Sequence, residues 1–380
     1  MTSLVDCLES HAAAHPDRRL SSFLNVDGSE RRSYTYGSFA EHTRRLAGHL
    51  AGHVGLKHGD RALLAYPPGL DIIVALFACA RVGVIPVPVS PPSSVSLDAA
   101  RAKMAFIAHD CRATALLTTR SFSRSYRARL AGPGSACRRA PTPLPDLTWV
   151  TTDDIDASAR DRSRDDPNSI LLLQYTSGST SDPKGVIVSH ENVIHNALST
   201  IDHVPVGVSW LPQSHDMGLI GYYLFPVVMG GTTYGFSPLD FLRRPILWLQ
   251  TMSRVRATYA SSPNFGFEYC LREEKLPTRQ LDGLDLRSVR VLMNAAEPVR
   301  AETYLRFLER FTPYGVRPEA HVAAYGLAEH TLTATHHGRR IVAVNKGLLQ
   351  QGRVCIEDTP PRNGGQMRLV SCGRPREGAR

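Results

Sequence analysis

Residues 174–185 have the composition of a loop that can hold phosphate groups. Gly178 lets the backbone approach a ligand closely, and Lys184 adds a mobile positive charge. Hydroxyls and backbone amides come from Thr176, Ser177, Ser179 and Thr180. The loop differs from a Walker A motif, which needs Gly-Lys-Ser/Thr at the start of a helix, and an ordinary polar turn uses the same residue types. The order of the residues nevertheless favours phosphate binding.

A histidine–aspartate pair is the second candidate for chemistry. His215 and Asp216 follow an apolar run, 209–212, that ends in a proline. An imidazole at such a place can steer an anion, although a surface histidine beside a capping aspartate is a common alternative. The apolar stretch 218–225 comes next. It is equally consistent with the wall of a hydrophobic tunnel and with a core helix.

Two further candidates follow predicted strands. Residues 295–297, Ala-Ala-Glu, come after a strand predicted over 289–292. Small residues at the carboxyl end of a strand lie where α/β sheets bind ligands, but a plain strand-to-helix turn has the same pattern. Tyr325 can stack on a flat purine, and Gly326 permits close approach. Glu329 is a hard oxygen ligand of the kind that Mg²⁺ prefers.

The hydrophobic pattern predicts an α/β framework for these candidates. After a helix over 35–55, strands alternate with helices in the order 61–66, 70–81, 84–89, 96–109 and 113–118. This alternation implies a layered, largely parallel sheet. Residues 120–147 are rich in Arg, Pro and Gly and are predicted to form an irregular surface loop. A second α/β block is predicted from 170 to about 334.

The length of 380 residues is consistent with two or three domains or subdomains. We predict a first α/β subdomain over 1–150 and a polar linker over 151–168. A second α/β subdomain, with the candidate sites, is predicted over 169–338. The remaining residues, 339–380, are predicted to hold an insertion and the start of a further strand segment.

Composition narrows the function classes. The net charge of +9 indicates either solvated basic faces or an acidic partner, and the lack of a basic–aromatic stripe disfavours nucleic acid. Seven scattered cysteines without a Cys-x-x-Cys pair indicate a reducing compartment, so we expect the cytoplasm. The apolar stretch 70–89 is interrupted by Asp71, Arg81 and two prolines. It therefore predicts a buried helix and strand, not a membrane span.

The 174–185 loop resembles the ATP phosphate loop of the acyl-adenylate-forming superfamily, and its flanks resemble one branch, the fatty acyl-AMP ligases. Further matches to this branch lie at 4–6, 34–36, 59–61, 66–70, 86–89 and 188–192. The resemblance implies an α/β fold, the layered α-β-α-β-α N-terminal domain of the adenylate-forming enzymes. Ala328, where many superfamily members carry Thr, agrees with this branch. The segment 342–373 resembles the insertion that is specific to it.

The resemblance also implies roles for individual residues. Lys184, His215 and Glu329 would be catalytic, and Thr176 and Glu329 would bind Mg²⁺. The phosphates of ATP would lie against Thr176, Ser177, Gly178, Ser179, Thr180 and Lys184. The adenine would lie against Ala295, Ala296, Glu297, Tyr325 and Gly326. The acyl pocket would include His215, Asp216, Met217 and Gly221.

The reaction that the resemblance implies is attack of a fatty carboxylate on the α-phosphorus of Mg·ATP, which gives acyl-AMP and pyrophosphate. The acyl group would then pass to an acyl carrier protein or polyketide synthase, in lipid or polyketide biosynthesis. Family members continue beyond residue 380 into a small C-terminal domain, so we expect an N-terminal domain alone. Two alternatives stay open. One is a weakly active ATP- or acyl-adenylate-binding module or half of a split enzyme, and the other is a relative of the long-chain acyl-CoA ligases.

Overall fold

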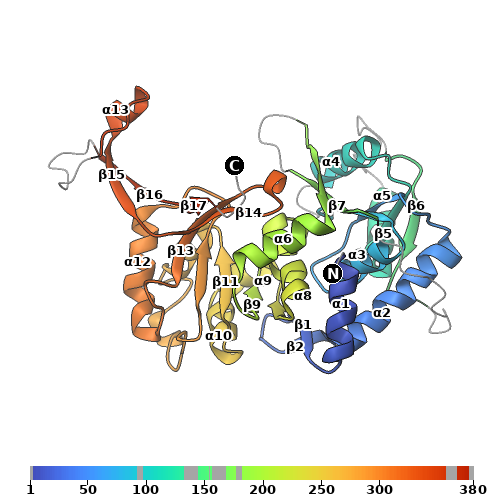
Figure 1. Ribbon diagram of the computed structural model, residues 1–380, viewed down its shortest axis with the longest axis horizontal. Coiled ribbons are helices and arrows are strands. Elements are labelled where there is room, and N and C mark those ends of the chain that lie inside the picture. Colours follow the sequence, from blue (N-terminus) through green and yellow to red (C-terminus); the bar gives the residue numbers. More distant parts are fainter. Residues whose placement is uncertain are drawn as a thin grey trace.

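The computed structural model describes residues 3–91, 97–131, 144–153, 155, 168–176, 182–356 and 366–375. Two main sheets, with helices packed on them, form the body of the protein (Figure 1). One large cluster of buried apolar side chains extends from one sheet to the other, and a smaller cluster lies on the far face of the four-stranded sheet.

The four-stranded sheet is entirely parallel and has the order β4-β3-β5-β6. Its strands are β3 (Arg61–Leu64), β4 (Ile85–Pro88), β5 (Ala115–Thr118) and β6 (Thr148–Thr151). Alternate residues enter different cores: Ala62 and Leu64 join the large cluster, whereas Leu63 and Leu116 join the small one. Burial on both faces explains why these strands are continuous apolar runs, and it confirms the predicted parallel α/β unit.

Three helices connect the strands of this sheet: α3 (Asp71–Arg81), α4 (Leu97–Asp110) and α5 (Arg120–Ala131). The first two were predicted. The prediction of an irregular loop over 120–147 was wrong for residues 120–131, which form α5. The glycines and prolines of that stretch begin only at Gly132, and Phe122 and Tyr126, four residues apart, stack in a row that continues to Trp149. This i, i+4 pair gives the helix an apolar side.

The nine-stranded sheet has the order β17-β14-β13-β12-β11-β9-β10-β1-β2. The six strands from β13 to β1 are parallel, and antiparallel strands complete both edges. Its strands are β1 (Arg19–Leu24), β2 (Glu30–Thr35), β9 (Val206–Ser209), β10 (Thr232–Gly235), β11 (Tyr259–Ser262), β12 (Val291–Asn294), β13 (His321–Gly326), β14 (Thr333–Gly338) and β17 (Gly373–Pro375). Two strands from the first 35 residues thus belong to this sheet, and the predicted division at residue 150 stays a prediction.

The remaining helices cover the two sheets and shape the edge that carries the site (Figure 1). They are α1 (Leu4–Ala14), α2 (Tyr36–His49), α6 (His190–Thr200), α7 (Asp216–Leu219), α8 (Phe225–Met229), α9 (Pro238–Arg243), α10 (Ile246–Arg254), α11 (Asn264–Cys270), α12 (Ala301–Phe311) and α13 (Lys346–Gln350). Shorter turns are the π-helical η1 (Leu50–Val54) and η3 (Ile220–Leu224) and the 3₁₀ turns η4 (Thr278–Gln280), η5 (Thr312–Tyr314) and η6 (Ala328–His330). Within the described residues, no helix has both the length and the apolar character that crossing a membrane requires.

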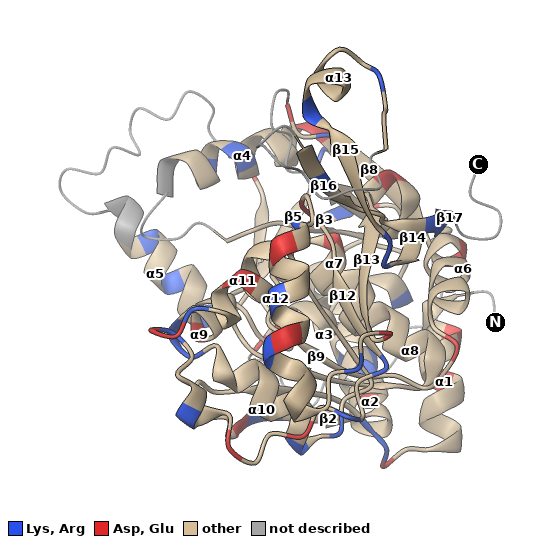
Figure 2. Ribbon diagram, turned by 90° about the vertical axis from the view of Figure 1, so that its left-hand side faces the viewer, with Lys and Arg blue, Asp and Glu red and all other residues tan. Residues whose placement is uncertain are grey.

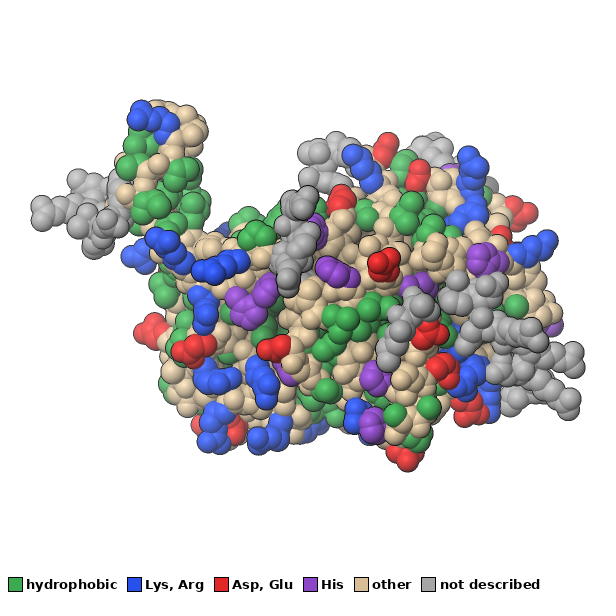
Figure 3. All heavy atoms as spheres, viewed as in Figure 1, with side chains coloured by type: hydrophobic (Ala, Val, Ile, Leu, Met, Phe, Trp, Pro, Cys, Tyr) green, Lys and Arg blue, Asp and Glu red, His purple; other side chains and the backbone are tan. Residues whose placement is uncertain are grey.

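Two antiparallel hairpins complete the structure. The first, β7 (Ile170–Tyr175) with β8 (Gly185–Ser189), packs against β4 between the two sheets. The second, β15 (Ile341–Asn345) with β16 (Gln366–Val370), projects from the body as an arm with α13 near its tip (Figure 1). Hydrophobic side chains gather on this arm (Figure 3), and Val354, Ile356 and Met367 are exposed there. Its identity as the branch-specific insertion stays a prediction.

Candidate active site

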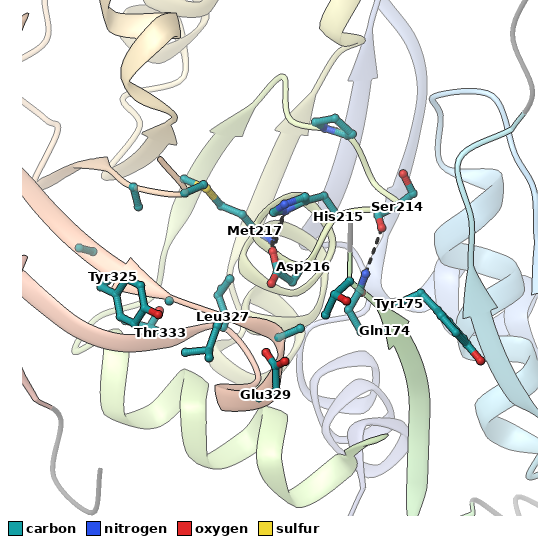
Figure 4. A pocket seen from close by; sticks show the side chains of 18 of the residues that line it. Gln174, Tyr175, Ser214, His215, Asp216, Met217, Tyr325, Leu327, Glu329 and Thr333 are labelled. Atoms are coloured by element: carbon teal, nitrogen blue, oxygen red, sulfur yellow. Dashed lines mark hydrogen bonds and ion pairs between the residues drawn. The ribbon is translucent and has the colours of Figure 1, made fainter. Parts of the chain in front are cut away.

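A cavity of about 370 Å³ lies where the carboxyl edge of the nine-stranded sheet meets β7 (Figure 4). Most of its lining comes from the segments that follow β7, β9, β12 and β13, which is where α/β sheets place their ligand sites. The lining residues are Ser90, Lys103, Gln174, Tyr175, Thr176, Pro212, Ser214, His215, Asp216, Met217, Tyr259, Met293, Ala295, Ala296, Ala324, Tyr325, Gly326, Leu327, Ala328, Glu329, Leu332 and Thr333.

One wall of the cavity, which we call the Tyr325 side, consists of Ala295, Ala296, Tyr325 and Gly326 at the ends of β12 and β13. Ala296 has a φ of 69°, which is uncommon for a residue with a side chain. Tyr325 is 54% exposed as a residue and lines the cavity, so its ring is accessible to a ligand. A Cβ at Gly326 would lie 1.9 Å from the carbonyl oxygen of Leu332. An open aromatic face beside small, tightly packed residues suits a flat heterocycle.

Glu297, predicted to contact adenine, is not among the residues that line the cavity. Its Oε1 accepts a hydrogen bond from the backbone N–H of Phe265 at 2.5 Å, so it binds the first turn of α11. The structure therefore gives this carboxylate a local partner. Its contact with a nucleotide stays a prediction.

The predicted phosphate loop is the turn of the β7–β8 hairpin, and Ser177, Gly178, Ser179 and Thr180 lie outside the described residues. Both ends of the turn are described. The N–H of Thr176 donates to the carbonyl of Lys184 at 3.0 Å, and Thr176 lines the cavity. Lys184 is exposed and is not among the lining residues. The predicted strand–loop–strand geometry is confirmed, and phosphate binding by the loop stays a prediction.

A second wall, which we call the His215 side, consists of Pro212, Ser214, His215, Asp216 and Met217 after β9. Side-chain hydrogen bonds join this segment to other elements. The Nε2 of Gln213 donates to the carbonyl of Gly69 at 2.8 Å, and its Oε1 accepts from the N–H of Gly69 at 3.0 Å. The Nε2 of Gln174 donates to the carbonyl of Ser214 at 3.1 Å. These contacts fix the peptide that precedes the histidine.

His215 lies at the N-cap of α7, and its side chain is 52% exposed. Its Nδ1 is 2.6 Å from Oδ1 of Asp216, and Figure 4 shows the two side chains side by side. The hydrogen bond to Asp216 raises the pKa of His215 above its ordinary value, against a smaller lowering by burial. An imidazolium whose Nδ1–H is held by Asp216 can attract a carboxylate or phosphate.

The predicted acyl-pocket residues divide into two groups. His215, Asp216 and Met217 line the cavity, whereas Gly221 does not. Gly221 lies in the π-helical turn η3, and a Cβ there would lie 3.2 Å from Cδ2 of Leu332, which does line the cavity. Residues 218–225 are all buried, so the structure supports the core-helix alternative for this stretch. A role for Gly221 toward an acyl chain stays a prediction.

Two oxygen donors in the cavity fit a magnesium ion. The carboxylate of Glu329 and the hydroxyl of Thr176 both belong to lining residues, and both are hard ligands. Among the described residues, no group of three or more His, Cys, Asp or Glu side chains could hold a metal ion. Mg²⁺ is commonly held by one or two carboxylates together with substrate phosphates. The donor set therefore fits an ion that arrives with a nucleotide.

Several residues that line the cavity were not predicted from the sequence. Gln174 is 3% exposed, and its Oε1 has no hydrogen-bond partner among the described residues. Tyr259 comes from the start of β11, Leu332 precedes β14, and Lys103 comes from α4 beside the other sheet. Only Gln174 carried a signal, because it is the first residue of the predicted loop. The others reach the cavity through tertiary packing.

Comparison with known proteins places these features in context. A family model described as AMP-binding enzyme matches residues 8–379. The medium-chain-fatty-acid–[acyl-carrier-protein] ligase JamA of Moorena producens is 35% identical, with 98% of this chain and 63% of that protein aligned. The long-chain-fatty-acid–AMP ligase FadD32 of Mycolicibacterium smegmatis is 32% identical, with 94% of this chain and 58% of that protein aligned. The chain thus spans 58–63% of the length of these two relatives.

A solved structure shows the same architecture. The fatty acyl-adenylate ligase from Legionella pneumophila, crystallised with acyl adenylate and pyrophosphate, has a TM-score of 0.86 against this chain at 33% identity. The match covers 99% of this chain and 64% of that one.

Proposed function

We propose that this chain, which belongs to the AMP-binding enzyme family, activates a fatty acid as its acyl-adenylate. A carboxylate oxygen of the acid would attack the α-phosphorus of ATP, and the bond from that phosphorus to the pyrophosphate oxygen would break. Acyl-AMP and pyrophosphate are the products. Relatives named as fatty acid–AMP and fatty acid–carrier-protein ligases support this proposal.

One observation carries the proposal: three kinds of chemistry meet in a single cavity. The open ring of Tyr325 suits a purine, Glu329 offers a ligand for Mg²⁺, and His215, whose pKa the hydrogen bond to Asp216 raises, offers an imidazole to a carboxylate. An adenylating enzyme needs these three functions close together, because the reaction joins a nucleotide to an acid. Such a transfer depends mainly on positioning and on neutralising charge.

Different residues of the chain would bind the carboxylate, the phosphates and the metal ion. His215 would hold the carboxylate against the α-phosphate, and Lys184 would neutralise charge on the phosphates. A single cation 4 Å from a phosphate contributes about 4 kcal/mol near a protein surface. Glu329 and Thr176 would hold Mg²⁺, which when bound neutralises phosphate charge.

We also propose that the acyl group passes to an acyl carrier protein, the acceptor for which the Moorena relative is named, and that this transfer serves lipid or polyketide biosynthesis. The cytoplasm is the proposed location. The six described cysteines are all unpaired, which supports a reducing compartment.

The test is direct detection of acyl-AMP by mass spectrometry after incubation of the chain with Mg·ATP and a panel of medium- and long-chain fatty acids. We expect Glu329→Gln and Lys184→Ala each to lower the rate of acyl-AMP formation by about 100-fold, the loss typical of a removed charge-stabilising group. Lys57→Ala, at an exposed lysine that does not line the cavity, is the matched control and should retain the rate.

Each alternative has its own outcome in this assay. Binding of ATP, measured by calorimetry, without acyl-AMP from any acid would indicate a binding module or an incomplete enzyme. Acyl transfer to coenzyme A in preference to a carrier protein would indicate a relative of the acyl-CoA ligases. Equal rates from the Glu329→Gln variant and the unsubstituted chain would refute the assigned cavity.

A further inference from the structure

Two neighbouring helices outside the cavity expose large apolar side chains. Leu239 and Leu242 on α9 are 63% and 39% exposed, and Phe265 on α11 is 45% exposed. The helices touch, because the hydroxyl of Tyr269 on α11 donates to the carbonyl of Leu242 at 3.0 Å. We call the surface formed by Leu239, Leu242, Phe265 and Tyr269 the α9–α11 face; these helices lie toward the left of the view in Figure 2. Apolar groups gathered in this way mark interaction sites more often than isolated ones do.

The α9–α11 face rests on a tightly packed base. The ring of Trp210 stacks on Phe241 with 4.1 Å between centroids, and Phe265 meets Trp210 edge-on at 5.5 Å. A Cβ at Gly266 would lie 2.7 Å from Trp210, so α11 approaches this base as closely as a glycine allows. The apolar side chains are therefore presented by a rigid platform, which lowers the entropy cost of binding a partner.

A basic rim borders the face. It consists of Arg243, Arg272, Lys275 and Arg279, all of them exposed. The guanidinium of Arg272 and the ammonium of Lys275 lie 5.5 and 5.6 Å from the centre of the Tyr269 ring. Arg243, Lys275 and Arg279 also line a polar hollow of about 500 Å³ beside α10, together with Arg244.

The acidic residues near the rim are fewer than the basic ones. Asp240 accepts from the backbone and hydroxyl of Ser237 and lies 3.9 Å from Arg243, and Glu273 pairs with Arg310 at 2.9 Å. Glu274 is exposed. Glu268 on α11 lies 3.9 Å from Arg306, and Glu297 accepts from the N–H of Phe265. With Arg244, Arg306 and Arg310 added to the four rim residues, seven basic residues thus face five acidic ones, four of which already have partners, and the balance favours a negatively charged partner.

The α9–α11 face is connected to the cavity by the backbone. Helices α9 and α11 follow β10 and β11, so they begin at the same carboxyl edge of the sheet as the cavity. The N–H of Phe265 binds the carboxylate of Glu297, and Glu297 directly follows Ala295 and Ala296 in the cavity wall. A partner on this face would therefore lie beside the edge at which the product forms.

We propose that the α9–α11 face is the docking surface for an acidic acyl carrier protein. A helix of the carrier would place an apolar side chain among Leu239, Leu242 and Phe265, and its carboxylates would meet the basic rim. An apolar centre within a charged border is the usual anatomy of a specific interface, and opposite charge speeds the encounter. The inference rests on the proposed function, which requires a protein that accepts the acyl group.

The test measures binding of a fluorescently labelled holo-acyl carrier protein from bacterial fatty acid synthesis to the full chain, by fluorescence anisotropy. We expect Leu239→Ala and Lys275→Glu each to weaken the Kd by about tenfold or more, as at the centre of an interface. We expect Leu198→Ala on α6, where the leucine is 60% exposed, and Lys57→Glu to change the Kd by less than about twofold. Added salt should weaken binding, because the rim is exposed.

Other outcomes would overturn the docking proposal. They are an unchanged Kd in both face variants, equal losses in both controls, and no saturable binding by the unsubstituted chain. Binding to phosphatidylglycerol vesicles but not to the carrier would assign the face to a membrane surface instead. Acyl-AMP formation is measured separately and should be unaffected by the face variants. Its absence from the unsubstituted chain would refute the proposed function while leaving the measured Kd values to judge the docking surface.

Discussion

The Tyr325 side and the His215 side of the cavity differ in what holds them in place. On the Tyr325 side the backbone itself is closely packed, with Gly326 directly against the carbonyl of Leu332. On the His215 side Gly218 also lies against a carbonyl, that of Pro212, but the segment before His215 is held in addition by side-chain amides, those of Gln213 and Gln174. A wall fixed by backbone contact fails when any side chain is added. A wall fixed by side-chain hydrogen bonds loses stability by a limited amount with each hydrogen bond that is removed.

The largest effect should come from the backbone-fixed wall. Gly326→Ala places a Cβ 1.9 Å from a carbonyl oxygen, so β13 or β14 must move. We expect the free energy of unfolding to fall by about 3 kcal/mol or more, at or beyond the upper end of the usual overpacking range. Urea denaturation measures this loss. Gly52→Ala, where no atom lies within 4 Å of the new Cβ, is the control, and equal stability of the two variants would break the comparison.

A smaller loss is expected for Gln213→Met on the side-chain-fixed wall. The variant keeps the volume of the side chain but leaves the buried N–H and carbonyl of Gly69 without their partner. We expect a loss of about 2 kcal/mol in the free energy of unfolding, measured in the same way. Gln351→Met, at an exposed position, should change stability little. A Gln213→Met variant as stable as this control would show that the loops are held by other contacts.

Gln174→Met should change the KM for the fatty acid more than the KM for ATP. It removes one hydrogen bond to the peptide before His215, so we expect the KM for the fatty acid to rise by about tenfold. The KM for ATP should stay within about twofold, because among the described residues the side-chain amide of Gln174 donates to Ser214 on the His215 side and its Oε1 has no hydrogen-bond partner on the Tyr325 side. Steady-state kinetics measure both constants. An equal rise in both would show that the walls move together.

The smallest effect should be a shift in pH dependence at the His215 side. The hydrogen bond to Asp216 raises the folded-state pKa of His215 above 6.5, so the stabilisation is complete below pH 6.5 and is lost as the pH rises through the raised pKa. Asp216→Asn removes the main cause, and the pKa of His215 should fall. NMR titration of the imidazole ring measures this pKa. An unchanged pKa would mean that Asp216 does not control the charge of this wall.

The features that sequence analysis predicted are local. The resemblance to fatty acyl-AMP ligases is confirmed by the family match and the relatives, and the layered α/β fold by the Legionella structure. The parallel sheet and the β7–β8 hairpin were predictable, since buried strands are continuous apolar runs and Gly and Ser mark their ends. Helix α5 was missed because composition was averaged over a stretch whose glycines and prolines begin only at Gly132.

The features that sequence analysis missed depend on contacts between segments that are distant in the chain. Gln213 meets Gly69 across 144 residues, and nothing in either neighbourhood indicates the other. The 188–192 match has a partly structural explanation: Ser189 caps α6 through a reciprocal pair with Asn192. His190 is buried, and its Nδ1 accepts from the N–H of Leu4 at 3.0 Å. Motifs can therefore indicate a family through residues that fold the chain and do not reach the ligand.

The pairing of β1 with β10 has a consequence for how the protein is made. The hydroxyl of Thr232 donates to the carbonyl of Arg19, 213 residues earlier in the chain. At about 5–20 residues per second, a ribosome needs about 10 to 40 s to synthesise that stretch. During this interval β1 and β2 form at most a two-stranded ribbon, which is marginally stable alone and has an open hydrogen-bonding edge. A chaperone that covers the β1 edge would act in that interval, before translation delivers β10.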